Sequence, residues 1–215
     1  MLKLLFIFTF LLCSTIAYCF EPQSGDIFFQ ESISSDFTDA IKGVTKSAKK
    51  HNFSHCGIAY VDSSSKPPAI YVIEAIPETG VTITPLSVFL QRDTTAGGKP
   101  MVAVGRLDDS LKFAIPHSIE YSMKLRGKPY DYEFDFDNDK YYCSELLYFA
   151  FRDEKQQPIF KATPMTFVDA KSKDATDYWK EYFAKLGIPI PEGKMGVNPG
   201  GISRSKCIKI VHSYY

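Results

Sequence analysis

Apolar residues in the first half of the chain occur in short runs that predict β-strands. Two runs, residues 55–61 and 69–76, are apolar at both odd and even positions, as in central strands buried on both faces. A linker rich in Ser and Pro, residues 62–68, joins them, so we expect the two strands to pair antiparallel. Shorter strands are predicted at residues 25–30, 80–84, 101–107 and 207–211.

Helical spacing is clearest from Cys143 onward. Apolar residues recur there three and four positions apart, which predicts a helix with one face in the core; they are Leu146, Leu147, Tyr148, Ala150 and Phe151. Asp137, Asn138 and Asp139 precede this helix as candidate N-caps. Other helices are predicted at residues 36–48, 86–92, 108–126 and 177–186, and Pro116 interrupts the third of them.

Within residues 130–139, aromatic side chains stand at positions 130, 132, 134 and 136, and acidic side chains stand at positions 131, 133, 135, 137 and 139. In an extended strand or arm, this alternation would turn the aromatic rings inward and the carboxylates toward water. The run also supplies the first three ligand positions of a calcium loop, but Lys140 and Leu146 replace the Gly and Glu that such a loop requires. We therefore predict no calcium loop here, and no metal or cofactor elsewhere.

Composition predicts one globular domain without a nucleic-acid partner. The chain has 215 residues, of which 45% are hydrophobic, and this is enough for one domain with a proper core. Lys plus Arg and Asp plus Glu number 25 each. Because no basic excess is present, the charge gives no argument for binding nucleic acid.

The first residues have the pattern of an export signal. Lys3 precedes an apolar run at residues 4–12, and a short stretch of smaller residues follows. The run is shorter than the roughly 20 apolar residues that span a bilayer. We therefore expect a signal peptide at residues 1–19, no stable membrane span after its removal, and a secreted or periplasmic domain at residues 20–215.

The sequence allows signal cleavage after Ala17 or after Cys19 and does not choose between them. A lipid anchor on Cys19 is the weaker of the ideas for this end of the chain. The residue before a lipidated cysteine is normally small, and Tyr18 is not.

Cys143 is the candidate nucleophile. Cys56, Cys143 and Cys207 follow the signal without CxxC spacing, and a bridge between Cys56 and Cys207 would leave Cys143 free. In the first turn of a helix, unpaired N–H groups and the helix dipole favour a thiolate over a thiol. The alternative is a buried structural cysteine, since free cysteines are among the most buried residues.

Thiol hydrolysis also needs an imidazole and a polar group that orients it. His55 begins one central strand, and Glu74 is a carboxylate inside the other, where an unpaired charge would cost several kcal/mol. If Val61 pairs with Pro68, Glu74 lies opposite His55 with Cβ atoms about 5 Å apart. An imidazole-to-carboxylate hydrogen bond is then within reach.

Three other histidines compete with His55 for the role of the base. His51 lies in a polar run with two lysines, His117 follows a helix-breaking proline, and His212 is near the C-terminus. None of the three has a buried acid nearby by pattern, so His55 remains the first candidate.

Five short motifs follow one another over most of residues 21–152. They are residues 22–30, 53–58 (Phe-Ser-His-Cys-Gly-Ile), 72–75 (Val-Ile-Glu-Ala), 127–132 (Gly-Lys-Pro-Tyr-Asp-Tyr) and 142–146 (Tyr-Cys-Ser-Glu-Leu). In their order and composition they resemble the YiiX-type permuted papain-like amidases of the NlpC superfamily. These are cysteine hydrolases in which the histidine strand precedes the cysteine helix. Residues 198–205 match less strongly, and residues 160–194 match least.

The resemblance implies an α+β fold, a circularly permuted papain-like domain with a mostly antiparallel sheet packed on a helix that bears the nucleophile. It also implies Cys143 as the nucleophile, His55 as the general base and Glu74 as the third polar member. The backbone N–H of Cys143 would help to hold the oxyanion. Tyr142 and Tyr130 are the candidates for a second oxyanion donor.

We therefore expect an exported thiol hydrolase that cleaves an amide bond in a peptide, an amino-acid amide or a murein fragment. The acidic run at residues 131–139 predicts a preference for substrates with a free amino group. Two alternatives stay open: a lipid-directed acyltransferase or phospholipase, as in related permuted folds, and a non-catalytic binding module that uses the same cleft.

Overall fold

The computed structural model of the protein describes residues 20–48, 50–169 and 173–215. The signal peptide predicted at residues 1–19 lies outside the described residues. In the described part, no helix is long and apolar enough to cross a membrane.

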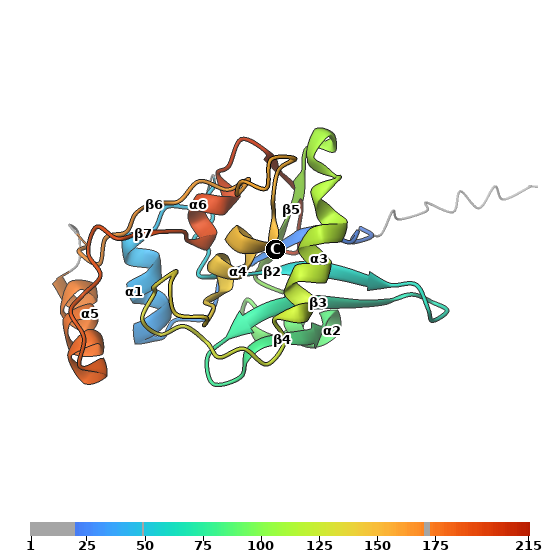
Figure 1. Ribbon diagram of the computed structural model, residues 1–215. Coiled ribbons are helices and arrows are strands. Elements are labelled where there is room, and N and C mark those ends of the chain that lie inside the picture. Colours follow the sequence, from blue (N-terminus) through green and yellow to red (C-terminus); the bar gives the residue numbers. More distant parts are fainter. Residues whose placement is uncertain (1–19, 49, 170–172) are drawn as a thin grey trace, which may run out of the picture.

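Among the described residues, six strands form one antiparallel sheet in the order β4-β3-β2-β1-β5-β8 (Figure 1). Each of the six strands predicted outside residues 130–139 is present, with its ends within about two residues of the expected positions. The strands are β1 (Ile27–Gln30), β2 (His55–Asp62), β3 (Ala69–Ile76), β4 (Gly80–Pro85), β5 (Val102–Leu107) and β8 (Ile208–Ser213). Together with the helices, this sheet gives the α+β fold that was predicted.

The helices also follow the apolar spacing, with differences at their ends. The helix expected at residues 36–48 ends four residues early, and that expected at 108–126 is split into a 3₁₀ turn and α3. Pro116 lies in the first turn of α3, where its missing N–H has no partner to lose. The elements are α1 (Asp36–Val44), α2 (Leu86–Arg92), η1 (Asp109–Leu111), α3 (Ala114–Lys124), α4 (Cys143–Ala150), α5 (Lys173–Leu186) and α6 (Pro199–Ser203), with a small sheet of β6 (Thr163–Pro164) and β7 (Met195–Gly196).

Helices cover both faces of the sheet. Alternate side chains of a strand point to opposite faces. Phe29 and Ile58 therefore join Leu147 of α4 in one core, whereas Phe28 joins Phe89 of α2 in another core on the opposite face. The central strands are thus buried on both sides, which is why their apolar runs show no alternation.

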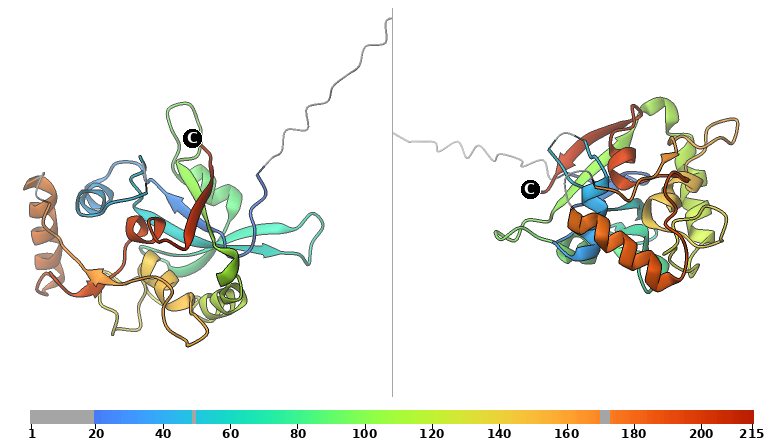
Figure 2. Two further views of the ribbon diagram at one scale, coloured as in Figure 1. Left: turned by 90° about the horizontal axis from the view of Figure 1, so that it is seen from above. Right: turned by 90° about the vertical axis from the view of Figure 1, so that its left-hand side faces the viewer.

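A third apolar cluster lies between the sheet, α4 and the pair α1 and α5. Trp179 and Phe183 of α5 are fully buried there against Leu146 of α4, and the Trp179 indole donates to the Ala40 carbonyl of α1 at 3.3 Å. The left view in Figure 2 shows α5 beside α1 at one end of the molecule. Helices α1 and α5 thus form part of the wall around the cavity that Cys143 lines.

Residues 130–139 form a loop, so the strand predicted there is wrong. Asp131 is fully buried and accepts the backbone N–H groups of Glu133 at 2.8 Å and Asp135 at 2.7 Å, and the side-chain amide of Asn138 at 2.8 Å. Phe134 adopts a positive φ of 54°, which no extended strand allows. The expected exposure of every carboxylate fails at Asp131 because an Asx-type turn needs this side chain inside.

The N-cap of α4 also differs from the prediction. The cap is Tyr142, not one of the acidic or amide residues at 137–139. Its backbone N–H donates to the Glu145 carboxyl at 3.1 Å, which satisfies one of the free donors at the helix start. Burial raises the pKa of Glu145 to about 9, so this carboxyl is neutral at pH 7 and does not oppose a thiolate at Cys143.

Candidate active site

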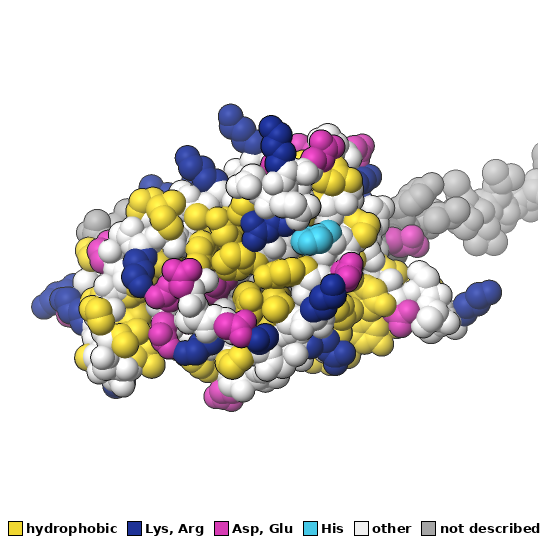
Figure 3. Space-filling model, viewed as in Figure 1, with side chains coloured by type: hydrophobic (Ala, Val, Ile, Leu, Met, Phe, Trp, Pro, Cys, Tyr) yellow, Lys and Arg dark blue, Asp and Glu magenta, His cyan; other side chains and the backbone are white. Residues whose placement is uncertain are grey.

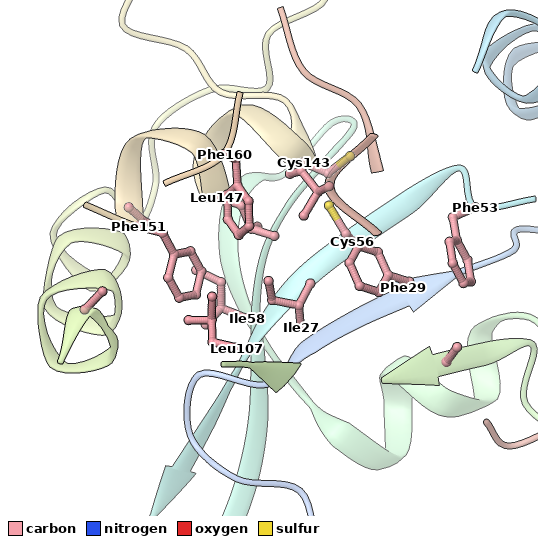
Figure 4. Close-up of a cluster of buried hydrophobic side chains, with 14 residues drawn as sticks. Ile27, Phe29, Phe53, Cys56, Ile58, Leu107, Cys143, Leu147, Phe151 and Phe160 are labelled. Atoms are coloured by element: carbon pink, nitrogen blue, oxygen red, sulfur yellow. The ribbon is translucent and has the colours of Figure 1, made fainter. Parts of the chain in front are cut away.

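Cys143 is the first residue of α4, and its side chain lies against β2. Leu147 and Ala150, further along α4, pack with Ile58 of β2 in one buried cluster, which fixes the start of the helix over the strand. Figure 4 shows the Cys143 side chain at this contact. The residue is only 6% exposed, and it lines two cavities.

His55 and Glu74 meet, but in a different register from the predicted one. Ile58 pairs with Ile73 and Asp62 with Ala69, so the predicted pairing of Val61 with Pro68 is wrong by two residues. A shift of two residues keeps every side chain on the same face. His55 and Glu74 are therefore diagonal neighbours, and the distance from His55 Nε2 to Glu74 Oε2 is 2.5 Å.

Gly57 makes room for this contact, because the carboxylate lies beside a residue that has no side chain. A Cβ at Gly57 would lie 3.1 Å from the Glu74 Cβ and 2.4 Å from Val72 Cγ1. Any other residue here would push the two strands apart. The glycine is thus required by the contact between His55 and Glu74 across β2 and β3.

Two further residues hold Glu74, and sequence reasoning missed both. Arg92 at the end of α2 donates to both carboxylate oxygens, from Nη1 to Oε2 at 2.9 Å and from Nη2 to Oε1 at 2.7 Å. Thr84 of β4 donates to Oε1 at 2.5 Å. Burial alone would raise the pKa of Glu74, but the hydrogen bonds from Arg92 and His55 outweigh it and lower the pKa to about 2.

The His55 imidazole contacts Cys143 as well as Glu74. Burial lowers the pKa of His55, but hydrogen bonds to Cys143 and Glu74 outweigh burial and raise it to about 9. The pKa of the Cys143 thiol is lowered well below its usual value by hydrogen bonds from Cys56 and from His55. Both pKa shifts favour a thiolate facing an imidazolium, the state in which a cysteine attacks.

Cys56, the residue after His55, is the second group that contacts the Cys143 sulfur. Figure 4 shows the Cys56 sulfur directed toward Cys143, and both its thiol and its backbone N–H lower the pKa of Cys143. Burial, together with the neighbouring Cys143, raises the pKa of Cys56 itself, so Cys56 stays a thiol and acts as the donor. Cys56 and Cys207 carry free thiols, and the bridge considered from the sequence is not formed.

The two tyrosines expected near the oxyanion differ in their contacts. The Tyr142 hydroxyl accepts a hydrogen bond from the backbone N–H of Val197 at 3.2 Å. This bond holds the residue that follows β7 against the start of α4. For the Tyr130 hydroxyl, the described residues supply no hydrogen-bond partner. Burial raises the pKa of Tyr130 well above its usual value, so the hydroxyl keeps its proton as a donor. Tyr130 lines both cavities beside Cys143.

Two cavities meet at Cys143, and Tyr130, Ile41 and Ser54 line both of them. The first cavity, about 260 Å³, is mainly apolar, and its walls include Val44, Phe134, Met165, Phe167 and Trp179. The second, about 230 Å³, reaches His55 and Arg92 and is also lined by Gln30, Phe37 and Pro77. Figure 3 shows hydrophobic side chains gathered over the middle of one face, with charged side chains around them.

The competing histidines have other contacts. His51 Nδ1 lies 3.1 Å from Glu31 Oε1, His117 Nδ1 lies 3.2 Å from the Ala150 carbonyl oxygen, and the His212 ring stacks on Phe20. None of the three lines either cavity at Cys143 among the residues described. The structure therefore brings only His55 to the candidate nucleophile.

The acidic loop carries less free charge than its sequence suggests. Glu133 pairs with Lys140, Asp135 with Lys194 at 2.8 Å, and Asp139 with Lys128. These lysines neutralise three of the carboxylates that were expected to attract a substrate amine. The preference for substrates with a free amino group stays a prediction, now supported by fewer unpaired carboxylates.

A cysteine at the start of a helix, in contact with an imidazole on an earlier strand, defines a papain-like cysteine hydrolase with permuted element order. The chain belongs to the Peptidase_C92 family of permuted papain-like amidases of the YaeF/YiiX type, whose model matches residues 21–212. This membership makes the protein a cysteine hydrolase of the peptidase or amidase kind.

Two relatives support the same assignment. The uncharacterized protein YiiX of Escherichia coli K12 is 31% identical over 189 residues, which cover 85% of this chain and 83% of that protein. A crystal structure of YiiX from Escherichia coli O157:H7, described as a metalloprotein, superposes with a TM-score of 0.73 at 25% identity. It covers 91% of this chain and 99% of the YiiX chain.

No metal cluster is evident in residues 20–48, 50–169 and 173–215. There, no group of three or more His, Cys, Asp or Glu side chains is placed to hold a metal ion.

Proposed function

We propose that this protein is an exported thiol hydrolase that cleaves an amide bond through Cys143, His55 and Glu74. The observation that carries the proposal is the position of His55, which lines one cavity together with Cys143 while its Nε2 lies 2.5 Å from Glu74 Oε2. A base held between a nucleophile and an orienting carboxylate is what acyl transfer requires. The substrate would be a peptide, an amino-acid amide or a murein fragment.

The reaction would proceed in two steps. The Cys143 thiolate attacks the amide carbonyl, and the imidazolium of His55 gives its proton to the leaving amine. A water molecule, deprotonated by His55, then attacks the thioester and releases the acid. Glu74 fixes the ring of His55 so that its other nitrogen faces Cys143 throughout.

The negative charge on the carbonyl oxygen would be held by the backbone N–H of Cys143 and by the Tyr130 hydroxyl. The first is free because it belongs to the first turn of α4. The second has no hydrogen-bond partner within the described residues, whereas the hydroxyl of Tyr142 already contacts Val197. Of the two tyrosines considered from the sequence, the contacts favour Tyr130.

The test is the pH dependence of Cys143 alkylation by iodoacetamide, followed by mass spectrometry of the Cys143 peptide. In the wild-type protein, alkylation should remain fast well below the free thiol pKa of about 8.5. His55→Ala should remove the low-pH reactivity, and Glu74→Gln should reduce it. A wild-type Cys143 that titrates like a free thiol would refute the proposal.

The apolar cavity favours a second candidate, a hydrolase or acyltransferase that acts on lipids. Phe134, Met165 and Phe167 would suit an acyl chain better than a polar peptide. Peptide amides and p-nitrophenyl esters of C4 to C12 acids, assayed side by side, separate the two. Rates that rise with chain length on esters alone, with no cleavage of amides, would favour the lipid substrate.

Export is proposed from residues 1–19 alone. Expression in a bacterial host followed by fractionation would show whether the mature chain leaves the cytoplasm. Its N-terminal sequence would then distinguish cleavage after Ala17 from cleavage after Cys19. An uncleaved chain in the cytoplasm would contradict this part of the proposal.

A further inference from the structure

We propose that Arg92 is a positioning residue for the acid member of the triad: its guanidinium fixes the Glu74 carboxylate and sets the pH range over which Glu74 can hold His55. The inference rests on the proposed function, because it assigns a role to Arg92 within the same triad. Arg92 does not reach Cys143 and would act only through Glu74 and His55.

The hydrogen bonds of Glu74 leave its carboxylate one orientation. Oε1 accepts from Arg92 Nη2 at 2.7 Å and from Thr84 Oγ1 at 2.5 Å. Oε2 accepts from Arg92 Nη1 at 2.9 Å and lies 2.5 Å from His55 Nε2. Each oxygen thus has two partners, and rotation of the carboxylate would break at least two hydrogen bonds.

The guanidinium is itself held by α2. Phe89, one turn before Arg92, is fully buried on the face of the sheet that carries Phe28, and the Arg92 Cζ lies 5.3 Å from the Phe89 ring centroid. The His55 ring centroid lies 6.0 Å from the same phenyl ring. One short helix therefore packs against the base through Phe89 and binds the acid through Arg92.

Arg92 is the group with a permanent positive charge next to Glu74. The other titratable groups with an electrostatic effect on this network are His55, Cys56, Cys143 and Asp93, together with Tyr130, Tyr142 and Glu145 around Cys143, and none of them is a permanent cation. Without Arg92, Glu74 would be a buried carboxylate whose pKa burial raises. It would then take up a proton in mildly acidic solution, and His55 would lose its anionic partner.

Removal of the charge should move both ends of the pH profile of Cys143 upward. At the acid end, Glu74 takes up its proton at a higher pH and no longer supports the imidazolium of His55, so the thiolate forms only at higher pH. At the alkaline end, Glu74 is an anion no longer neutralised by Arg92, so it holds the proton on His55 to higher pH. Simple structural damage would reduce the rate at every pH without moving the inflections.

The experiment compares iodoacetamide alkylation of Cys143 between pH 4 and pH 10 in full-length wild-type protein, Arg92→Met and Arg92→Lys. We expect the acid inflection of Arg92→Met to rise by about one pH unit or more, since burial without a cation can raise a carboxylate pKa by several pH units. Arg92→Lys keeps the charge but not the bidentate contact with Glu74. Its acid inflection should therefore lie between those of the wild-type protein and Arg92→Met.

Arg106→Met is the matched control. Arg106 donates from Nε and Nη2 to the two oxygens of Asp26, both at 2.7 Å, on β5 of the same sheet. It should leave both inflections of Cys143 where they are in the wild-type protein. If Arg92→Met does not fold, Arg92→Lys and Thr84→Val test the inference instead, because Thr84→Val removes one donor to Glu74. In both variants the acid inflection should rise, but by less than is expected for Arg92→Met.

The outcomes separate this inference from the proposed function. A wild-type Cys143 without low-pH reactivity would refute the triad itself. Normal wild-type reactivity, with inflections in the folded Arg92 variants that coincide with those of Arg106→Met, would refute the role of Arg92 and leave the triad standing.

Discussion

Cys56 and His55 are consecutive residues of β2, and hydrogen bonds from both side chains lower the pKa of Cys143. Successive side chains of a strand point to opposite faces, so two groups this close in sequence rarely serve one atom. They do so here because β2 begins directly under the first turn of α4. The thiolate is therefore stabilised by a neutral thiol on one side and by an imidazolium on the other.

Cys56→Ala should raise the pKa of Cys143, because the first of its hydrogen-bond donors is lost. If this pKa rises by one pH unit, the thiolate fraction at a pH below the inflection falls about tenfold. The measurement is the alkylation rate of Cys143 at pH 5 to 6. Cys56→Ser keeps a donor and should restore most of the rate, and Cys207→Ala should have no effect.

An unchanged profile in Cys56→Ala would show that the imidazolium alone stabilises the thiolate. The loss of a small buried side chain costs about 1 kcal/mol in unfolding free energy. A melting curve of each variant would therefore confirm that the comparison is made on folded protein.

The low pKa of Glu74 predicts how stability depends on pH. Its value of about 2 lies below the ordinary 4.5, so its contribution is complete above pH 4.5 and is lost as the pH falls through about 2. As the pH falls below 4.5, the melting temperature should therefore decrease more steeply in the wild-type protein than in Glu74→Gln. The variant should be less stable at pH 6, where the wild-type carboxylate is fully ionised. Parallel curves for the two proteins would contradict a depressed pKa at Glu74.

The absence of a side chain at position 57 gives a separate prediction. Gly57→Ala would place a Cβ 2.4 Å from Val72 Cγ1 and 3.1 Å from the Glu74 Cβ, so β2 and β3 must separate. Overpacking of this kind costs about 1–3 kcal/mol. We expect a lower unfolding free energy in urea and slower alkylation of Cys143 at pH 6. Gly97→Ala is the control, since the nearest atom to its Cβ is Thr95 Oγ1 at 3.8 Å.

The same two strands show what the sequence could and could not predict. Apolar runs identified β2 and β3, and the period of two was enough to place His55 and Glu74 on one face. The exact register was missed by two residues, because parity cannot distinguish pairings that differ by two. The contact was nevertheless predicted, since a diagonal pair with long side chains can still meet.

Other errors have local causes. The alternation in residues 130–139 was interpreted as an extended strand, but a single side chain, Asp131, folds the segment by accepting two backbone N–H groups. A buried carboxylate at Glu74 required a partner, yet nothing in the sequence singled out Arg92 among 25 cationic residues. Position 56 was considered only for a disulfide, although its place next to His55 was a usable signal.

Replacement of the two tyrosines should separate oxyanion binding from structural support. Tyr130→Phe removes a hydroxyl without a partner in the described structure, so it should leave the melting temperature unchanged and reduce kcat by about a hundredfold, the usual effect of one oxyanion donor. Tyr142→Phe leaves the buried N–H of Val197 without its acceptor, which costs about 1–3 kcal/mol in stability. Both proteins would be compared by thermal melting and by steady-state kinetics on the best substrate of the amide and ester panel. A large loss of kcat in Tyr142→Phe, with Tyr130→Phe fully active, would transfer the role of oxyanion donor to Tyr142.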